Sequence, residues 1–279
     1  MALEDGIEEL RRSAEHRDGF DIVPWKLCRK IALREGVAPG VVERAALEKG
    51  LVPSRYERSL GTLGIMGQAR LLASRAAVVG CGGLGGLVVE LLARAGVGQL
   101  VLIDGDTFSD NNLNRQILCT EADLGKAKAL VAAERTKAVN GAVEVSPFPG
   151  FLDADNAASL LDGCGVAVDC LDNHRSRRIL FDACARLGIP AVHGAIAGFW
   201  GQVGTVLPGD RTLLDFWGDQ APDKGVEVTT GNPPFTPALV SSLEAAEAVK
   251  VLLGMEEILR HRLLWFDLRI QEAQTLPLN

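Results

Sequence analysis

A glycine-rich turn between a strand-like and a helix-like segment constrains the fold of this chain more than any other feature. The apolar run Ala76–Val79 leads into Gly80-Cys81-Gly82-Gly83-Leu84-Gly85, and an apolar helical pattern covers Leu84–Ala95. In such a unit the first glycine permits a tight turn, the second lets backbone N–H groups approach phosphate, and the third lets helix and strand pack closely. Bound phosphates then face the positive end of the helix dipole. We interpret this segment as a nucleotide-binding turn formed by Gly80, Gly82, Gly83, Leu84 and Gly85.

Strand-like and helix-like runs alternate after the glycine turn. The strand-like runs are Ala76–Val79, Leu100–Asp104, Val143–Phe148, Val166–Asp172, Ala191–Gly194 and Gln202–Leu207. The alternation predicts an α/β fold, a Rossmann-like, doubly wound and mostly parallel sheet with helices on both faces. Ligands of such sheets bind at the carboxyl ends of the strands. Asp104 ends the second strand, where a carboxylate can accept hydrogen bonds from ribose hydroxyls.

Two segments differ from this alternating pattern. Residues 1–53 contain charged, helix-period stretches with breaks near Pro24, Gly36 and Pro39, which predict a small helical extension. Residues 54–279 then form the nucleotide-binding domain. Within that domain, about residues 208–237 are rich in Gly, Pro, Asp and Thr, which predicts a long crossover loop. A loop of that length in a compact domain is usually functional or mobile.

Charge and composition exclude several classes of protein. The net charge is −7, which argues against a nucleic-acid partner because phosphate backbones require clustered Lys and Arg. The first residues, MALEDGIEEL, lack the apolar core of a signal peptide, and no apolar run reaches the ~18 residues of a membrane span. We therefore expect a cytoplasmic protein with no membrane partner. None of the cysteines forms a CxxC pair, so we expect all of them to be reduced thiols. They are Cys28, Cys81, Cys119, Cys164, Cys170 and Cys184.

Three polar clusters follow the glycine turn at positions where a strand ends or a helix begins. They are Asn111–Gln116, Gly125–Lys128 and Asp169–Asn173, and we expect them to converge on one crevice. Arg115 and Lys128 can neutralise charge on phosphate oxygens, and Asp172 can hold Mg²⁺. Gln116 belongs to the first cluster, while Asn112 and Asn173 can orient a nucleotide. Such a set suits transfer at phosphorus better than hydride transfer.

These clusters make the chain similar to the ThiF/MoeB/HesA family, the bacterial relatives of ubiquitin-activating enzymes, over about residues 55–254. The matching motifs are Arg55-Tyr56-Glu57-Arg58, Gly67-Gln68, the glycine turn, Asn112-Leu113-Asn114-Arg115-Gln116, Gly125-x-x-Lys128, Asp169-x-x-Asp172-Asn173 and Gly201-Gln202-Val203. The resemblance implies ATP- and Mg²⁺-dependent adenylation of the C-terminal Gly-Gly carboxylate of a small ubiquitin-like sulfur-carrier protein. Pyrophosphate is released in that reaction.

The resemblance also implies roles for individual residues. Asp104 would bind the ribose, Asn112, Arg115 and Lys128 would hold the phosphates, and Asp172 would lie near Mg²⁺. Arg58 would be donated to the ATP site of the partner subunit in a homodimer. The candidates for catalysis are therefore Arg58, Arg115, Lys128 and Asp172.

The chain departs from the family pattern in its cysteines. Many members bind a structural zinc ion through two CxxC pairs, which this sequence lacks, so we expect a zinc-free variant. Residues 208–237 contain no cysteine, so we expect adenylation without a thioester formed in that segment.

Three alternatives remain open from the sequence. The chain could adenylate another carboxylate, as do related enzymes that dehydrate a modified tRNA base. The glycine turn alone fits an NAD-dependent oxidoreductase. A non-catalytic partner subunit could keep the fold for binding only, although the set of Arg58, Arg115, Lys128 and Asp172 argues against that alternative.

Overall fold

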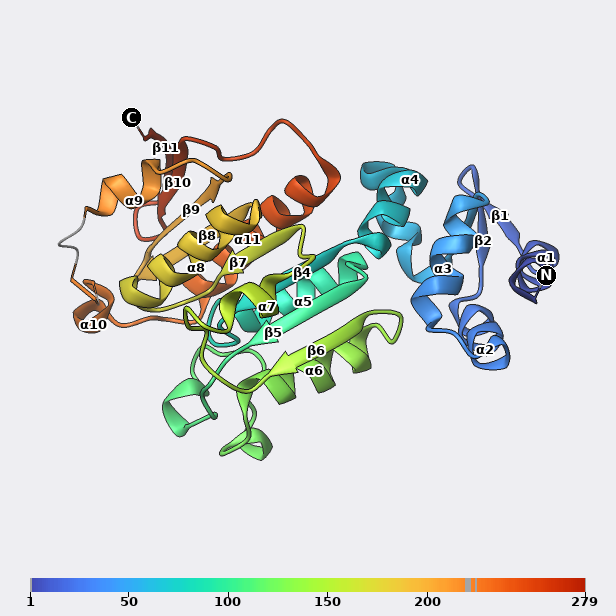
Figure 1. The fold of residues 1–279 in the computed structure, drawn as a ribbon, viewed down its shortest axis with the longest axis horizontal. Helices are drawn as coiled ribbons and strands as arrows, with labels where there is room; N and C mark the ends of the chain where they lie inside the picture. The colour runs from blue at the N-terminus through green and yellow to red at the C-terminus, as the bar shows by residue number, and fades with distance from the viewer. Residues whose placement is uncertain (1, 219–221, 224, 279) are drawn as a thin grey trace.

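The computed structural model describes residues 2–218, 222–223 and 225–278 and is built around a large twisted sheet (Figure 1). Within these residues the sheet has eight strands in the order β11-β10-β9-β8-β7-β4-β5-β6. The strands β8, β7, β4, β5 and β6 run parallel, and β9, β10 and β11 continue the sheet antiparallel. Their bounds are β4 Arg75–Val79, β5 Gln99–Ile103, β6 Glu144–Phe148, β7 Val166–Asp169, β8 Ala191–Ala197, β9 Trp200–Val206, β10 Arg262–Asp267 and β11 Glu272–Pro277.

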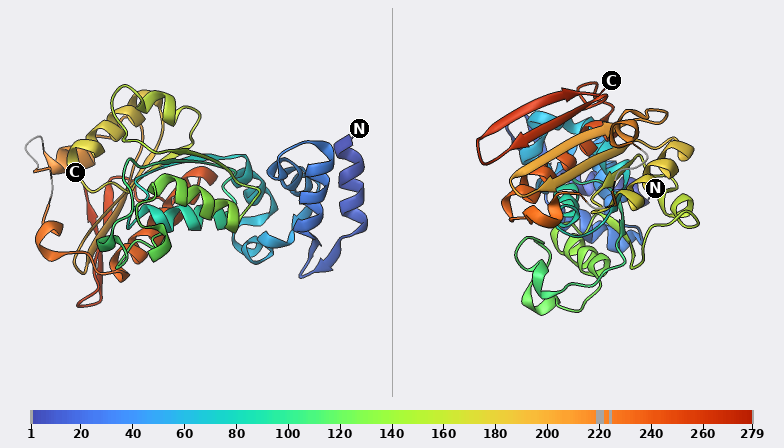
Figure 2. Two further views of the ribbon diagram at one scale, coloured as in Figure 1. Left: turned by 90° about the horizontal axis from the view of Figure 1, so that it is seen from below. Right: turned by 90° about the vertical axis from the view of Figure 1, so that its left-hand side faces the viewer.

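Helices cover both faces of this sheet because its central strands are apolar on both sides. On β4, Ala76 and Val78 face one core and Ala77 and Val79 face the other, and all four are buried. The first core is closed by α5 (Gly85–Ala95), α6 (Lys128–Val139) and α11 (Phe235–Leu253). The second is closed by α7 (Ala157–Leu161), α8 (His174–Leu187) and the short α9 (Thr212–Trp217) (Figure 2). The predicted Rossmann-like α/β fold is confirmed.

Element boundaries differ from the prediction at three places. Strand β7 ends at Asp169 instead of Asp172, because the Leu171 N–H turns away from the ladder and donates to Asp169 Oδ1 at 3.1 Å. The crossover segment (residues 208–237) was predicted as a loop but contains α9 and α10 (Glu227–Thr230), and α11 begins within it at Phe235. The antiparallel hairpin partner β11 was not predicted, since its six residues are all exposed and show no apolar alternation.

The first residues form a compact unit at the end of the large sheet where the parallel strands begin (Figure 1). This N-terminal unit (residues 2–53) contains α1 (Ala2–Arg12), β1 (Glu15–Arg17), β2 (Phe20–Val23), α2 (Trp25–Glu35), α3 (Pro39–Glu48) and β3 (Leu51–Pro53). The helices agree with the predicted helical extension, whereas the small sheet β1-β2-β3 was not predicted. Buried side chains of α1, α2 and α3, such as Leu10, Ile31 and Val42, give the unit a core of its own.

A second apolar cluster joins the N-terminal unit to the rest of the chain. Ile22, Leu47 and Val52 pack against Tyr56 and Leu60, which lie on the 3-10 helix η1 (Ser54–Ser59) and at the start of α4 (Leu60–Ala73). At the edge of this cluster lies Glu43, whose side chain is fully buried. No helix in the described part of the chain is both long and apolar enough to cross a membrane.

The buried carboxyl group of Glu43 makes the stability of the protein depend on pH. Burial raises the pKa of Glu43 from 4.5 to about 7, against the opposing effects of Arg55 and Tyr56. The folded protein therefore binds a proton that the unfolded chain releases, and the free energy of unfolding falls as the pH rises through about 4.5 to 7. This fall amounts to about 3 kcal/mol, and we expect Glu43→Gln to remove most of it.

The measurement is urea unfolding of both proteins at pH values below and above this window. The control is Glu48→Gln on the same helix, since Glu48 is exposed and pairs with Arg44 at 3.5 Å. An unchanged pH dependence of the free energy of unfolding in Glu43→Gln would contradict the raised pKa of Glu43.

Candidate functional site

A cavity of about 370 Å³ opens at the carboxyl ends of the parallel strands. That volume lies in the usual range for small-molecule sites. Strand ends, the glycine turn and the crossover segment all contribute to its walls. The polar and glycine residues that line it are Gly80, Gly82, Gly83, Asp104, Gly105, Asp106, Arg115, Gln116, Lys128, Gly150, Asp172, Asn173, Ser176, Arg177, Glu227 and Asn232.

The glycine turn (residues 80–85) uses its glycines in two different ways. Gly80 has φ = +94°, and a β-carbon there would lie 2.5 Å from the Cys170 carbonyl oxygen. A β-carbon on Gly85 would lie 1.7 Å from the Gly80 carbonyl oxygen. Gly80 therefore allows the loop after β7 to approach the turn closely, and Gly85 allows α5 to pack on the end of β4. Gly82 and Gly83 have only loose neighbours, at 3.5 and 3.8 Å or beyond, and they face the cavity.

Asp104 fastens the glycine turn to the end of β5. Its Oδ2 accepts a hydrogen bond from the Cys81 N–H at 2.7 Å, and its Oδ1 accepts one from the Asp106 N–H at 2.8 Å. Burial raises the pKa of Asp104, while these two N–H donors act in the opposite direction. Asp104 lines the cavity beside the turn, so its predicted ribose contact is geometrically open. That contact stays a prediction.

Two cations and one amide enter the cavity from the segment after β5. Arg115 Nη1 donates to the Asn111 carbonyl at 2.8 Å and to Asn114 Oδ1 at 2.9 Å, which holds its side chain beside Gly83. Lys128 is buried and its Nζ pairs with Asp106 Oδ2 at 3.0 Å. Gln116 is buried beside Gly82, and its Oε1 has no hydrogen-bond partner among the described residues.

Asp172 and Asn173 reach the cavity from the loop between β7 and α8. Asn173 caps α8, since its Oδ1 accepts a hydrogen bond from the Ser176 N–H at 2.8 Å. Its Nδ2 donates to Asp172 Oδ1 at 3.1 Å. The Asp172 side chain is exposed and lines the cavity. The loop therefore presents an accessible carboxylate from a rigid helix end.

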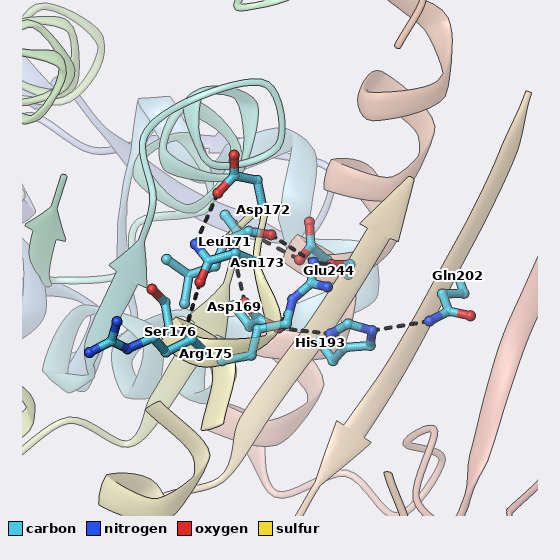
Figure 3. A network of polar contacts seen from close by, with 12 residues as sticks. Asp169, Leu171, Asp172, Asn173, Arg175, Ser176, His193, Gln202 and Glu244 are labelled. Atoms are coloured by element: carbon cyan, nitrogen blue, oxygen red, sulfur yellow. Dashed lines mark hydrogen bonds and ion pairs between the residues drawn. The ribbon is translucent and has the colours of Figure 1, made fainter. Parts of the chain in front are cut away.

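A buried charged cluster lies directly beneath this loop. Asp169 Oδ2 contacts His193 Nδ1 at 2.8 Å and Arg177 Nε at 3.2 Å, and Gln202 Nε2 lies 3.3 Å from His193 Nε2 (Figure 3). Arg177 Nη2 also donates to the Leu171 carbonyl at 2.6 Å. Burial lowers the pKa of His193, and the contacts fit a neutral imidazole that donates to Asp169.

Glu244 on α11 adds a second buried carboxyl group to the same region. It is fully buried, and Cys170 Sγ lies 3.9 Å from its Oε1. Burial raises the pKa of Glu244 well above its usual range, and the nearby Asp169 carboxylate acts in the same direction. A β-carbon on Gly194 would lie 2.3 Å from Glu244 Oε1, so β8 needs a glycine at this position.

Not every predicted site residue lies at the cavity. Among the described residues, Gly85, Asn112 and Arg58 lie outside the lining of the cavity. Gly85 serves packing, as described above. Asn112 is buried in the capping box of a 3-10 turn, where its Oδ1 accepts from the Ser109 N–H at 3.1 Å and its Nδ2 donates to Asn111 Oδ1 at 2.8 Å. Arg58 is exposed on η1.

Four residues that the sequence did not single out also shape the site. Phe151 follows β6, is 68% exposed at the cavity and lies against Gly105, where a β-carbon would be 2.7 Å from its ring. Asp106 pairs with Lys128, and Asn232 and Glu227 come from the crossover segment. These positions carry no local motif, so only the fold brings them to the cavity.

The cysteines show no sign of activation. Burial raises the pKa of Cys81 and Cys170 well above the ordinary value, and it also raises the pKa of Cys119. Nucleophilic and redox-active cysteines require a lowered pKa. The described residues contain no group of three or more His, Cys, Asp or Glu side chains placed to hold a metal ion.

Comparison with known proteins identifies the family of this fold and site. The sequence model of the ThiF family matches residues 56–279. The chain belongs to the ThiF family. The N-terminal unit lies outside the segment that the ThiF family model matches.

Two curated members of the ThiF family resemble the chain over most of their length. The SAMP-activating enzyme E1 of Haloferax volcanii is 39% identical, over 80% of this chain and 84% of the relative. The sulfur carrier protein adenylyltransferase of Thermus thermophilus is 39% identical, over 76% of this chain and 82% of the relative. A crystal structure of E. coli MccB shares the fold with a TM-score of 0.70 at 20% identity, over 81% of this chain and 70% of that one.

The two kinds of glycine in the turn predict two kinds of variant. We expect Gly85→Ala to destabilise the protein by about 3 kcal/mol or more, because its methyl group would meet the Gly80 carbonyl. Gly82→Ala is the matched control for folding, since its methyl group meets nothing closer than 3.5 Å. We expect this variant to fold normally but to bind ATP about 10-fold more weakly, because backbone N–H groups must approach phosphate there. Urea unfolding and calorimetric titration with ATP measure the two effects. Equal stability of both variants would contradict the packing role of Gly85.

Proposed function

We propose that this protein adenylates the C-terminal Gly-Gly carboxylate of a small ubiquitin-like sulfur-carrier protein with ATP and releases pyrophosphate. One observation carries the proposal: the glycine turn, Arg115, Lys128 and Asp172 line the same cavity of about 370 Å³. Membership of the ThiF family and two relatives named for carrier activation and adenylyl transfer support the same activity. They favour it over hydride transfer with NAD and over adenylation of another carboxylate, such as one on a modified tRNA base.

The chemistry asks little of acid–base groups. An oxygen of the carrier's terminal carboxylate forms a bond to the α-phosphorus of ATP, and the bond from that phosphorus to the pyrophosphate oxygen breaks. A terminal carboxyl group has a pKa of about 3.5, so the nucleophile is ionised at neutral pH and needs no general base. Catalysis then depends on positioning and on cations that stabilise the charge developing on the phosphate oxygens.

The residues around the cavity fit these demands. Gly82 and Gly83 line the cavity at the start of α5, a position where backbone N–H groups suit phosphate oxygens. Arg115 and Lys128 supply positive charge, and the contacts of each side chain hold it in place before substrate binds. Prior positioning avoids the cost of reorganisation when the transition state forms.

Mg²⁺ suits the same set of donors. It is usually bound by one or two carboxylates together with substrate phosphates and water. Asp172 lines the cavity, and its exposed carboxylate would hold the ion. When bound, Mg²⁺ neutralises phosphate charge and orients the triphosphate. Asp172 itself is oriented by Asn173, which caps α8.

The adenosine end of ATP would lie beside Asp104, on the side of the glycine turn away from Asp172. Asp104 ends β5 there and can still accept hydrogen bonds from ribose hydroxyls, since each carboxylate oxygen has two acceptor sites. Phe151 offers an exposed aromatic ring beside Gly105 for stacking on the base. Arg58 would complete the site of a second subunit in a homodimer, which accounts for its exposed position away from the cavity of its own chain.

Carrier-dependent exchange of pyrophosphate into ATP tests the proposed reaction directly. Each small protein from the same genome that ends in Gly-Gly serves as substrate. We expect Lys128→Ala to lower the exchange rate about 100- to 1000-fold, the usual effect of removing one cation or donor aimed at the transition state. The control is Lys126→Ala, because Lys126 is exposed and pairs with Asp123 at 2.9 Å. A folded wild-type protein that shows no exchange with any such carrier would overturn the proposal.

Phe151 predicts a separate effect on nucleotide affinity. Stacking of a base on an aromatic side chain is worth about 1–3 kcal/mol. We expect Phe151→Ala to raise the Kd for ATP about 5- to 150-fold and to leave the rate at saturating ATP nearly unchanged. Phe216→Ala is the matched control, since Phe216 is 62% exposed on α9 and outside the cavity lining. The same Kd in both variants would place the base elsewhere.

A further inference from the structure

We infer that Glu43 of the N-terminal unit is a positioning residue for Arg58, so that this unit sets the arginine that one subunit donates to the other. The inference rests on the proposed function in one respect, the role of Arg58 in the partner's site. Glu43 lies on α3, before residue 56 where the ThiF family match begins. The inference therefore gives a catalytic purpose to a part of the chain that the family pattern leaves without one.

Glu43 contacts η1 through both of its carboxyl oxygens. The fully buried Glu43 carboxyl group forms an ion pair with Arg55, with Oε1 and Nη2 3.2 Å apart. Its Oε2 accepts a hydrogen bond from the Tyr56 hydroxyl at 2.9 Å. Both partners lie on η1 (Ser54–Ser59), the 3-10 helix that also carries Arg58. One buried side chain of the N-terminal unit thus holds two consecutive residues of this short helix.

Contacts from the large domain hold η1 from the other side. Asn140, at the end of α6, donates to the Tyr56 hydroxyl at 3.2 Å and to the Ala93 carbonyl of α5 at 2.9 Å. Arg55 also donates to Asn140 Oδ1. A β-carbon on Gly96 would lie 2.6 Å from the Tyr56 ring, so the ring rests on the end of α5. The network therefore fixes η1 between the N-terminal unit and the far ends of α5 and α6.

The position of Arg58 depends on the contacts of Arg55 and Tyr56. A 3-10 helix has three residues per turn, so Arg55 and Arg58 are one turn apart on the same short helix. The N-terminal unit adds a stacking contact, since the Arg55 guanidinium lies 4.6 Å from the Trp25 ring centre. Arg17 of β1 lies 3.6 Å from Glu57, next to Arg58. Removal of the Glu43 side chain leaves Arg55 and the Tyr56 hydroxyl without their shared buried acceptor, so η1 and Arg58 would shift together.

A shift of this kind has a measurable effect on catalysis. Misplacement of a reacting or stabilising group by about 1 Å can cost up to about 100-fold in rate. We expect Glu43→Ala to lower kcat of carrier-dependent exchange about 10-fold or more and to leave the KM for ATP unchanged. Glu43→Gln keeps the size of the side chain and its acceptor oxygen, so it should restore most of the rate. Arg34→Ala is the control in the same unit, because Arg34 pairs with Glu9 and Glu35 at the surface of this unit.

Mixed dimers separate an effect through Arg58 from an effect within one chain. A Lys128→Ala chain paired with a Glu43→Ala chain retains one site with an intact cavity and an Arg58 held by an intact Glu43. We expect the purified mixed dimer to recover about half of the wild-type rate, as a purified mixed dimer of Lys128→Ala and Arg58→Ala chains should. Glu43→Ala should also cause no further loss in an Arg58→Ala chain. Failure of the mixture to recover, or an additive loss, would overturn the inference.

Hydrogen–deuterium exchange of residues 54–60 provides a readout that does not depend on activity. We expect faster amide exchange there in Glu43→Ala and wild-type exchange in Glu43→Gln. If Glu43→Ala does not fold, Arg55→Met removes the other partner of the ion pair and should loosen the same segment. Unchanged exchange in η1 overturns the inference even if carrier adenylation is established. A wild-type protein without adenylation activity overturns the proposed function, and the placement of η1 by Glu43 is then judged by amide exchange alone.

Discussion

The close approach of α5 to the end of β4 is the constraint on which the rest of the site depends. With a β-carbon on Gly85 only 1.7 Å from the Gly80 carbonyl, this packing is possible for glycine alone. Once it is made, the start of α5 points into the crevice between the strand ends. Two further contacts hold the turn there: Ser241 of α11 donates to the Leu84 carbonyl at 2.8 Å, and Asp104 accepts from the Cys81 N–H. These side-chain contacts to the backbone of the turn thus fix one wall of the cavity.

The charged cluster beneath the loop after β7 also holds part of the cavity wall in place, but it does so with buried charges. Buried ionised groups are stabilising only when they are paired and hydrogen-bonded. Asp169 meets this condition through Arg177, His193 and the Leu171 N–H, whereas burial raises the pKa of Glu244 and so disfavours a second charge beside it. Trp217 of the crossover segment packs on the same cluster, with its ring centre 5.0 Å from that of His193. The loop that carries Asp172 is therefore supported from below by this cluster, of which Arg177 also lines the cavity.

The sequence predicted those parts of the molecule whose pattern is local. The alternation of buried apolar runs gave the parallel strands and their helices, and the glycine spacing placed the turn correctly. Strand β11 was not predicted because an exposed strand shows no apolar alternation. The strands of the N-terminal unit are too short to show such an alternation. Asn112 lies in the expected cluster, yet a capping box engages its amide, which spacing alone does not reveal. Phe151 and the pairing of Glu43 with η1 depend on tertiary contacts between segments far apart in the chain.

Asp104 shows how a single carboxylate can limit the evolution of a binding site. Both of its oxygens hold backbone N–H groups of the turn and of the strand end, while the same residue faces the cavity. In many dinucleotide-binding folds the residue at this place can be exchanged to accept a different ribose substituent. Here such an exchange would also release the glycine turn, so a lineage that changed its nucleotide would lose the shape of the site in the same step. Diversification of proteins built in this way is therefore expected at the surfaces that choose the carboxylate substrate, with the nucleotide left unchanged.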